Sequence, residues 1–218
     1  MRQALISAAV LGVLGVATSA GAAVLVEYNF GGAAPQTVAP NMAASNVAPT
    51  NLAVFNSFAT SATYGSGNPF LQTAPNFGSQ GDPAGAYARN EYWSLTLTPD
   101  VGYFLDLDTL DFTVFRGGPS GIRGFAVYSS LDAFATPLLV VNNEAGTRAA
   151  PRAESIALSG GFDNVTTPVT FRFYIHSVNN ASSVDFDNVR FTGSVAVIPE
   201  PAALGMLMLP AAMLLRRR

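Results

Sequence analysis

The chain has 218 residues, no cysteine and a formal net charge of −3 at pH 7. Without cysteine, neither disulfides nor thiol chemistry can contribute to stability or function. Between the two terminal segments described below, residues 23–198 contain seven arginines and thirteen acidic residues, a net charge of −6. This balance argues against nucleic acid or an anionic membrane surface as a partner.

The N-terminus has the three parts of a secretory signal peptide. Met1-Arg2 is followed by an uncharged apolar stretch from Ala4 to Val16 and then by small residues. Ala20-Gly21-Ala22 supplies the small residues that signal peptidase requires, which predicts a signal peptide over residues 1–22 and a mature chain beginning at Ala23. Cleavage after Ala20 is the alternative. The sequence therefore predicts export through the secretion machinery.

Residues 23–198 are long enough for one domain with a sizeable hydrophobic core. The segment from Gly31 to Ala88 is rich in small and polar residues, which predicts short irregular strands around Asn51–Phe58 and long loops around Gly65–Ala86. Elsewhere, apolar runs bounded by turn residues predict strands at 24–30, 93–97, 104–115, 124–129, 155–158, 169–178 and 183–195.

Two of these strands alternate between apolar and mostly polar residues, which is typical of a strand with one buried face. The apolar positions are Leu110, Phe112 and Val114 in one strand, and Val169, Phe171, Phe173 and Ile175 in the other. No segment with a helical period separates the strands. The sequence therefore predicts an all-β fold, a single antiparallel β-sandwich of the jelly-roll kind, with helices only in the two terminal segments.

A catalytic centre is not evident in the sequence. The single histidine, His176, falls in the strand 169–178, on the same face as Arg172 and Tyr174, and we expect it to be a residue of the sheet surface. A hydrolytic triad would need a serine and an acid beside it, and the chain contains no Gly-x-Ser-x-Gly motif. We therefore expect no enzymatic activity.

Acidic residues alternate along the last strand, where Asp185 and Asp187 would face the same side. Neighbouring like charges need a cation or an arginine, and carboxylate oxygens are ligands that calcium prefers. By analogy with the terminal strands of jelly rolls, one interpretation, which is not the favoured one, is a structural calcium bound by Glu27, Asp185 and Asp187. The alternative is neutralisation by Arg190, Arg116 or solvent. No other cofactor is predicted.

Aromatic residues offer a binding function, because they stack on sugar rings when they share a concave, exposed face. The candidates are Tyr92, Trp93, Tyr103, Tyr128 and Tyr174. Core packing is the commoner role of such residues in a sandwich, and we expect Trp93 to be buried. If Phe171, Phe173 and Ile175 fill the core, the alternate side chains must point outward. The predicted glycan-binding residues are therefore Arg172, Tyr174 and His176.

The C-terminus consists of Pro199-Glu200-Pro201, a wholly apolar run from Ala202 to Leu215, and three arginines, Arg216, Arg217 and Arg218. The run would be about 21 Å long as a helix, whereas an independent transmembrane helix needs roughly twenty residues. The prolines keep the segment before the run extended, and the arginines hold its end on the cytoplasmic side.

This tail resembles the PEP-CTERM sorting signal of exported bacterial proteins, with residues 199–218 as the signal. The resemblance implies recognition by a membrane-embedded exosortase, transient inner-membrane association, and release to the cell surface or extracellular matrix of a Gram-negative-type bacterium. The body is similar to the β-rich ectodomains found ahead of this tail, in the stretches 93–99, 129–134 and 186–191. Those ectodomains share no common activity.

Three functional hypotheses follow. The favoured one is a non-catalytic protein of the cell surface or matrix, structural or adhesive. The second is a carbohydrate-binding jelly-roll module for extracellular polysaccharide, which an exposed aromatic platform would support. The third is a secreted hydrolase, which would require a cleft lined by paired acids or by His176 with a serine.

Overall fold

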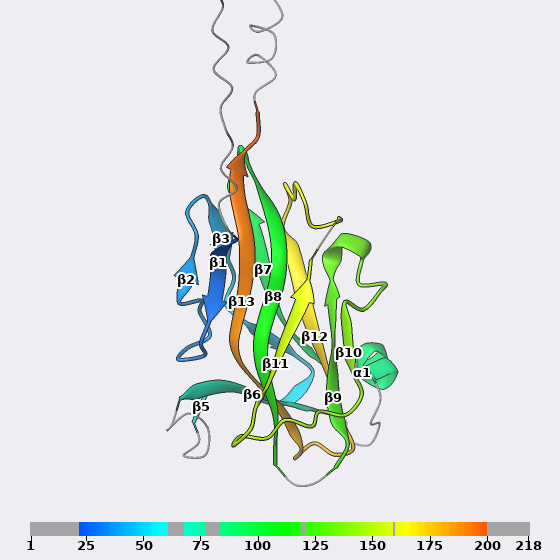
Figure 1. The fold of residues 1–218 in the computed structure, drawn as a ribbon. Helices are drawn as coiled ribbons and strands as arrows, with labels where there is room; N and C mark the ends of the chain where they lie inside the picture. The colour runs from blue at the N-terminus through cyan, green and yellow to red at the C-terminus, as the bar shows by residue number, and fades with distance from the viewer. Residues whose placement is uncertain (1–21, 61–67, 77–82, 119–120, 159, 200–218) are drawn as a thin grey trace, which may run out of the picture.

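The computed structural model describes residues 22–60, 68–76, 83–118, 121–158 and 160–199. In these ranges strands are the main secondary structure, and helix is scarce (Figure 1). The strands are β1 (Ala23–Tyr28), β2 (Thr37–Val38), β3 (Met42–Ala44), β4 (Ala48–Thr50), β5 (Leu52–Thr60), β6 (Pro69–Pro75), β7 (Tyr92–Pro99), β8 (Tyr103–Gly117), β9 (Arg123–Ser129), β10 (Leu139–Val141), β11 (Arg152–Ala157), β12 (Val169–Ser177) and β13 (Ser183–Val197). The helices are α1 (Pro83–Arg89) and the single-turn η1 (Ser130–Asp132).

The longest strands, β8 and β13, form the centre of one sheet, here called the β13 sheet. They pair antiparallel from Ser183 opposite Gly117 to Val197 opposite Tyr103. The strand order is β11-β8-β13-β1-β2. On the side of β13 that carries β1, the start of β13 pairs with β6, which in turn pairs with β5. One side of β13 is thus shared by two strands in succession.

The second sheet, here called the β12 sheet, has the order β10-β9-β12-β7-β3. Its strand pairs are antiparallel, and β4 pairs with the start of β7 while β3 pairs with its end. The central strand β12 is rich in aromatic and β-branched residues, which favour strands.

The two sheets pack face to face, and the alternation predicted for β8 and β12 is confirmed. Leu110, Phe112 and Val114 are buried, as are the apolar positions of β12. Trp93 of β7 is fully buried and stacks on Phe173, with ring centroids 3.9 Å apart. The all-β, antiparallel sandwich predicted from the sequence is therefore the fold of the described residues. The two predicted terminal helices fall in residues 1–21 and 200–218, outside the described residues.

The segment predicted as loops around Gly65–Ala86 differs from the expectation. It contains β6 and most of α1, a seven-residue helix of about two turns. A helix this short shows no recognisable period in the sequence. Its position matters, because α1 contacts β12 and β9 of the β12 sheet.

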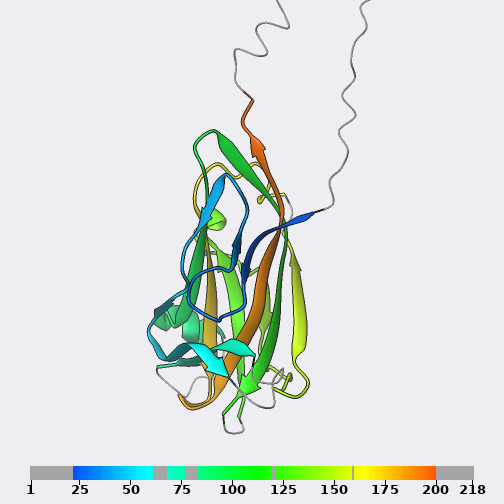
Figure 2. The same ribbon diagram turned by 90° about the vertical axis from the view of Figure 1, so that its left-hand side faces the viewer.

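The first described strand begins, and the last one ends, toward the same end of the sandwich. Ala23, the first residue of β1, pairs with Gly193 near the end of β13, and the two strands run antiparallel. Figure 2 shows β13 (orange) ending at the top of the view, with β1 (dark blue) starting beside its upper part. Pro199, the first residue of the predicted sorting motif, is exposed two residues beyond β13. The other motif residues, Glu200, Pro201 and Arg216–Arg218, lie outside the described residues. None of the helices in the described part of the chain has the length and apolar character needed to cross a bilayer.

Candidate functional site

The predicted glycan-binding residues come from β12. Its apolar residues point into the core, so Arg172, Tyr174 and His176 share the outer face of the β12 sheet, as expected from the alternation. The expected exposure is wrong for two of them. Tyr174 is 1% exposed and His176 is fully buried, whereas Arg172 is half-buried.

Tyr174 is buried because other aromatic residues pack over the outer face of the sheet. Tyr87 of α1 lies above it, with ring centroids 5.2 Å apart. Tyr92 of β7 and Tyr128 of β9 flank it at 5.1 and 5.3 Å. Tyr87 also contacts Tyr128 at 5.4 Å, so the helix residue closes the cluster from above.

His176 is buried for a different reason. It lies opposite Gly124 of β9, whose lack of a side chain leaves room for the imidazole. The Nε2 atom of His176 is 3.2 Å from the carbonyl oxygen of Val141 in β10. The interpretation of His176 as a sheet-surface residue is therefore incorrect, and this side chain does not face the solvent with Arg172.

Arg172 is held between two aromatic rings. The guanidinium carbon lies 4.5 Å from the ring centroid of Tyr92 and 3.7 Å from that of Phe134, the residue two beyond η1. Its Nη1 donates a hydrogen bond of 3.3 Å to the hydroxyl of Tyr174. These two cation–π contacts and the hydrogen bond to Tyr174 together fix the orientation of the guanidinium. We refer to Tyr87, Tyr92, Tyr128, Phe134 and Arg172 as the tyrosine patch.

The tyrosine patch is accessible to solvent. Tyr87 is 42% exposed, and the other four members are half-buried. Burial raises the pKa of Tyr128 in the patch and of Tyr174 beneath the patch. Their hydroxyls therefore stay neutral and can both donate and accept hydrogen bonds. The patch thus combines ring surface with a fixed guanidinium and neutral hydroxyls.

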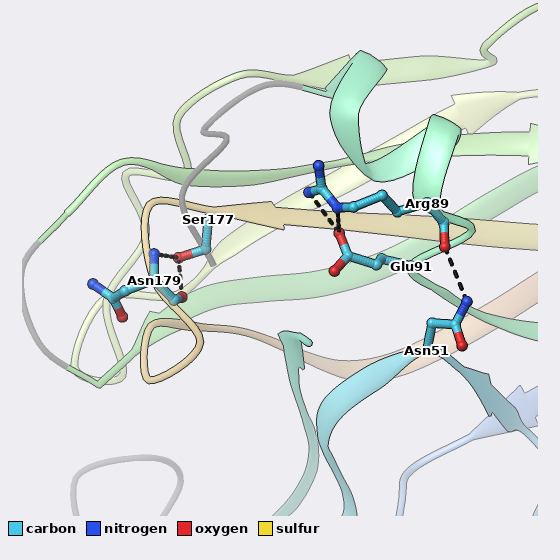
Figure 3. A network of polar contacts seen from close by, with 5 residues as sticks. All are labelled: Asn51, Arg89, Glu91, Ser177 and Asn179. Carbon is cyan, nitrogen blue, oxygen red and sulfur yellow. Dashed lines mark hydrogen bonds and ion pairs between the residues drawn. The ribbon is translucent and has the colours of Figure 1, made fainter. Parts of the chain in front are cut away.

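Polar contacts hold α1 on the sheet. The carboxylate of the buried Glu91 receives hydrogen bonds from Nε and Nη2 of Arg89, at 3.0 and 2.7 Å (Figure 3). Asn51, before β5, donates a hydrogen bond of 3.0 Å to the carbonyl oxygen of Arg89 at the end of the helix. Carbonyls at a helix end lack partners within the helix, so this bond satisfies one of them. The helix that carries Tyr87 is therefore anchored at its C-terminus.

Two members of the patch, Tyr87 and Phe134, are not predicted by the sequence. Tyr87 lies in a segment predicted as a loop, and Phe134 follows a turn in which both Ala133 and Phe134 have positive φ, at 57° and 61°. Positive φ is uncommon in alanine and phenylalanine, so the sequence contains no pattern that predicts this turn. Only the fold brings these rings onto β12.

The three predicted calcium ligands do not gather into one site. Asp187 is nearly buried, and its carboxylate accepts hydrogen bonds from the backbone N–H and the side-chain amide of Asn188, at 2.7 and 2.9 Å. Glu27 lines a separate hollow on the outer face of the β13 sheet. Among the described residues, no three His, Cys, Asp or Glu side chains lie close enough together to hold a metal ion.

Asp185 is fully buried on β13 and forms an ion pair with Arg148, with 3.3 Å between Oδ2 and Nη2. Burial raises the pKa of Asp185 to about 6, while the hydrogen bond from Ser183 and the charge of Arg148 act in the opposite direction. From the sequence, Arg190 and Arg116 are the expected neutralising residues. The structure instead pairs Asp185 with Arg148.

No protein-family model and no curated protein matches the sequence. Among solved structures, the chain is similar to the K3 cleaved adhesin domain of Lys-gingipain from Porphyromonas gingivalis, with 16% identity and a TM-score of 0.40 over 80% of this chain and 100% of that one. It is also similar to CBM27-1 from Caldicellulosiruptor saccharolyticus in complex with mannohexaose, with 14% identity and a TM-score of 0.42 over 64% and 82%. A Stig cyclase, Fisc from Fischerella sp. TAU, has 16% identity and a TM-score of 0.37 over 79% and 85%. At these TM-scores the likenesses carry no functional argument, and the fold assignment rests on the strand pairing described above.

Proposed function

We propose that this protein is an exported, non-catalytic binding module that holds extracellular polysaccharide at the tyrosine patch. The observation that carries the proposal is the fixed guanidinium of Arg172, held between Tyr92 and Phe134 on an outer face where Tyr87 is 42% exposed. Sugars present apolar C–H faces together with hydroxyl groups. A surface of aromatic rings with a positioned donor complements both features.

The affinity expected for such a site is low. The patch lies on the outer face of a sheet and offers few hydrogen-bonding groups, so one copy should bind with a Kd near millimolar, or about 4 kcal/mol. Since Arg172 is already oriented by its ring contacts, little additional ordering is needed on binding. Many copies along a polysaccharide would raise the overall avidity without new contacts.

The burial of His176 supports a non-catalytic role. It is the single histidine of the chain, it is fully buried, and its Nε2 lies against the carbonyl oxygen of Val141. A general base must reach the proton that it removes, directly or through one water. His176 in this position cannot reach a substrate on the sheet surface.

We further propose that the C-terminal tail directs the protein to an exosortase, which releases it at the cell surface or into the matrix. The tripeptide 199–201 follows β13 almost directly, and the start of the mature chain lies at the same pole. Intact-mass analysis of the secreted protein tests this proposal. The mature protein should lack residues 1–22 and the arginine tail, and Glu200→Ala should retain the protein in the inner membrane. Extracellular protein that still carries Arg216–Arg218 would contradict it.

Polysaccharide binding is tested with the mature secreted protein on a glycan array, followed by affinity electrophoresis with the polysaccharides that bind. Tyr87→Ala removes exposed ring surface and should reduce binding at least several-fold. Tyr103→Ala, which changes a half-buried tyrosine on the β13 sheet, is the matched control and should bind as the wild type does. Unchanged binding by Tyr87→Ala, or no binding by the wild type, would refute the proposal.

A further inference from the structure

The outer face of the β13 sheet carries a polar hollow of about 500 Å³. Four of its lining residues are consecutive partners across four adjacent strands, in the order Glu27 on β1, Arg190 on β13, Asp111 on β8 and Ser155 on β11. We call these residues the acid–arginine row. With neighbouring strands about 4.8 Å apart, the row is about 14 Å long.

A β-bulge shapes this hollow. Between Asp187 and Arg190, β13 uses one residue more than β8, which pairs there through Thr113 and Asp111. Asn188, within the bulge, has a positive φ of 50°. A bulge bends its strand and redirects side chains. Asn188 and Arg190, just after the bend, both line the hollow.

The row contains hydrogen-bonding groups that remain available to a ligand. Arg190 is 44% exposed, and its Nη2 lies 3.6 Å from Oδ2 of Asp111, which is too long for a hydrogen bond. Within the described part of the chain, the carboxylate of Glu27 makes no hydrogen bond or ion pair. An acceptor and several donors therefore lie side by side and open to solvent.

Asp111 is held in place by its neighbours. Its Oδ1 accepts a hydrogen bond of 2.5 Å from the hydroxyl of Ser155, and its Oδ2 accepts one of 2.8 Å from Thr109. Thr109 is in turn bonded to Thr192 at 2.7 Å. The centre of the row is therefore oriented before any ligand arrives, which lowers the cost of binding.

We propose that the acid–arginine row binds a neutral, hydroxyl-rich ligand, namely a segment of an uncharged polysaccharide. An anion would meet the carboxylates of Glu27 and Asp111, and a cation would meet the guanidinium of Arg190. A sugar hydroxyl can donate to a carboxylate and accept from a guanidinium, so neighbouring hydroxyls fit the alternating charges. The aromatic lining residue, Phe112, is buried in the core, so recognition here relies on hydrogen bonds instead of stacking.

The acid–arginine row lies on the β13 sheet, whereas the tyrosine patch lies on the β12 sheet. Binding of a polysaccharide to the row therefore does not depend on the patch. The test is isothermal titration of the mature secreted protein with cellohexaose, mannohexaose and galactohexaose as neutral probes and hexagalacturonate as the anionic probe. We expect a neutral oligosaccharide to bind with an affinity that changes little with salt. Glu27→Gln and Arg190→Gln should each weaken that binding tenfold or more, because hydrogen bonds to charged groups are lost.

Asp108→Asn, which changes an exposed aspartate on β8 outside the hollow, serves as the control variant and should leave this affinity unchanged. Binding lost in Tyr87→Ala and retained in Glu27→Gln would overturn the acid–arginine row while leaving the tyrosine patch in place. The reverse pattern would support the row and remove the patch. No binding of any neutral probe, or salt-sensitive binding of hexagalacturonate alone, would overturn the inference. Unchanged unfolding midpoints of the variants would show that the fold is intact.

Discussion

The ring of Tyr87 lies over the ring of Tyr174, with centroids 5.2 Å apart and an angle of 40° between their planes. This contact joins α1 to the central strand of the β12 sheet. Tyr174 points away from the core of the sandwich but is buried beneath Tyr87 and the other rings of the cluster. Tyr87 itself stays partly exposed. The two tyrosines should therefore respond differently to substitution.

Tyr174→Ala should destabilise the protein by about 3 kcal/mol or more, because removal of a buried aromatic ring loses its packing and leaves a cavity. Tyr87→Ala should cost much less, since part of that ring is already in solvent. Tyr174→Phe removes only the hydroxyl that accepts from Arg172 and should cost about 1 kcal/mol. Urea unfolding measures all three variants, and a Tyr174→Ala protein as stable as the wild type would show that the cluster is not packed as described.

The buried carboxyl of Asp185 should make stability fall as pH rises. Burial raises its pKa from 3.8 to about 6, so the folded state binds this proton more tightly than the unfolded state does. The resulting stabilisation is fully present below about pH 4 and is lost as the pH rises through about 6. Its size is up to about 3 kcal/mol, from 1.36 kcal/mol for each unit of pKa change.

Asp185→Asn isolates this contribution. The free energy of unfolding, measured in urea from pH 4 to 7.5, should decline less with pH in Asp185→Asn than in the wild type. Asp108→Asn changes an exposed aspartate on β8 and should keep the wild-type profile. If the wild type and Asp185→Asn show parallel profiles, Asp185 does not titrate in this range.

Gly124 is expected to tolerate no side chain. A Cβ at this position would lie 2.7 Å from Nε2 of His176 and would overlap the carbonyl oxygen of Val141. Gly124→Ala should therefore cost about 1–3 kcal/mol or more through overpacking. Gly161→Ala is the matched control, because a Cβ there meets no atom within 4 Å. Equal unfolding midpoints for the two variants would contradict this account of how His176 is buried.

Calcium should have little effect on stability. Of the three predicted ligands, Asp185 is paired with Arg148, and Glu27 lines a separate hollow. Asp187 is therefore the one carboxylate that lines its own hollow, together with asparagines. Calcium affinity depends on the number of charged ligands. We expect equal melting midpoints in chelator and in millimolar calcium. A rise that Asp187→Asn abolishes would show that Asp187 and the surrounding asparagines, Asn29, Asn68 and Asn188, form a calcium site after all.

Much of the sandwich follows from local sequence. The side chains of a strand alternate between two faces, so the order of apolar and polar residues in β8 and β12 already separates core from surface. The same rule correctly placed Arg172 and Tyr174 on the outer face. The burial of Trp93 follows from the same alternation along β7. These properties depend on neighbours two residues apart, which the sequence displays directly.

Whether an outer face remains exposed is decided by tertiary structure. Tyr174 is buried by a helix that precedes it by more than eighty residues, and Arg172 is covered by a ring from a loop with unusual φ angles. The acid–arginine row joins Glu27 to residues more than eighty positions away through strand pairing. Period-two alternation contains no information about which distant strands become neighbours. Strand neighbours are set by the burial and hydrogen bonding of the whole chain, and no local sequence pattern predicts them.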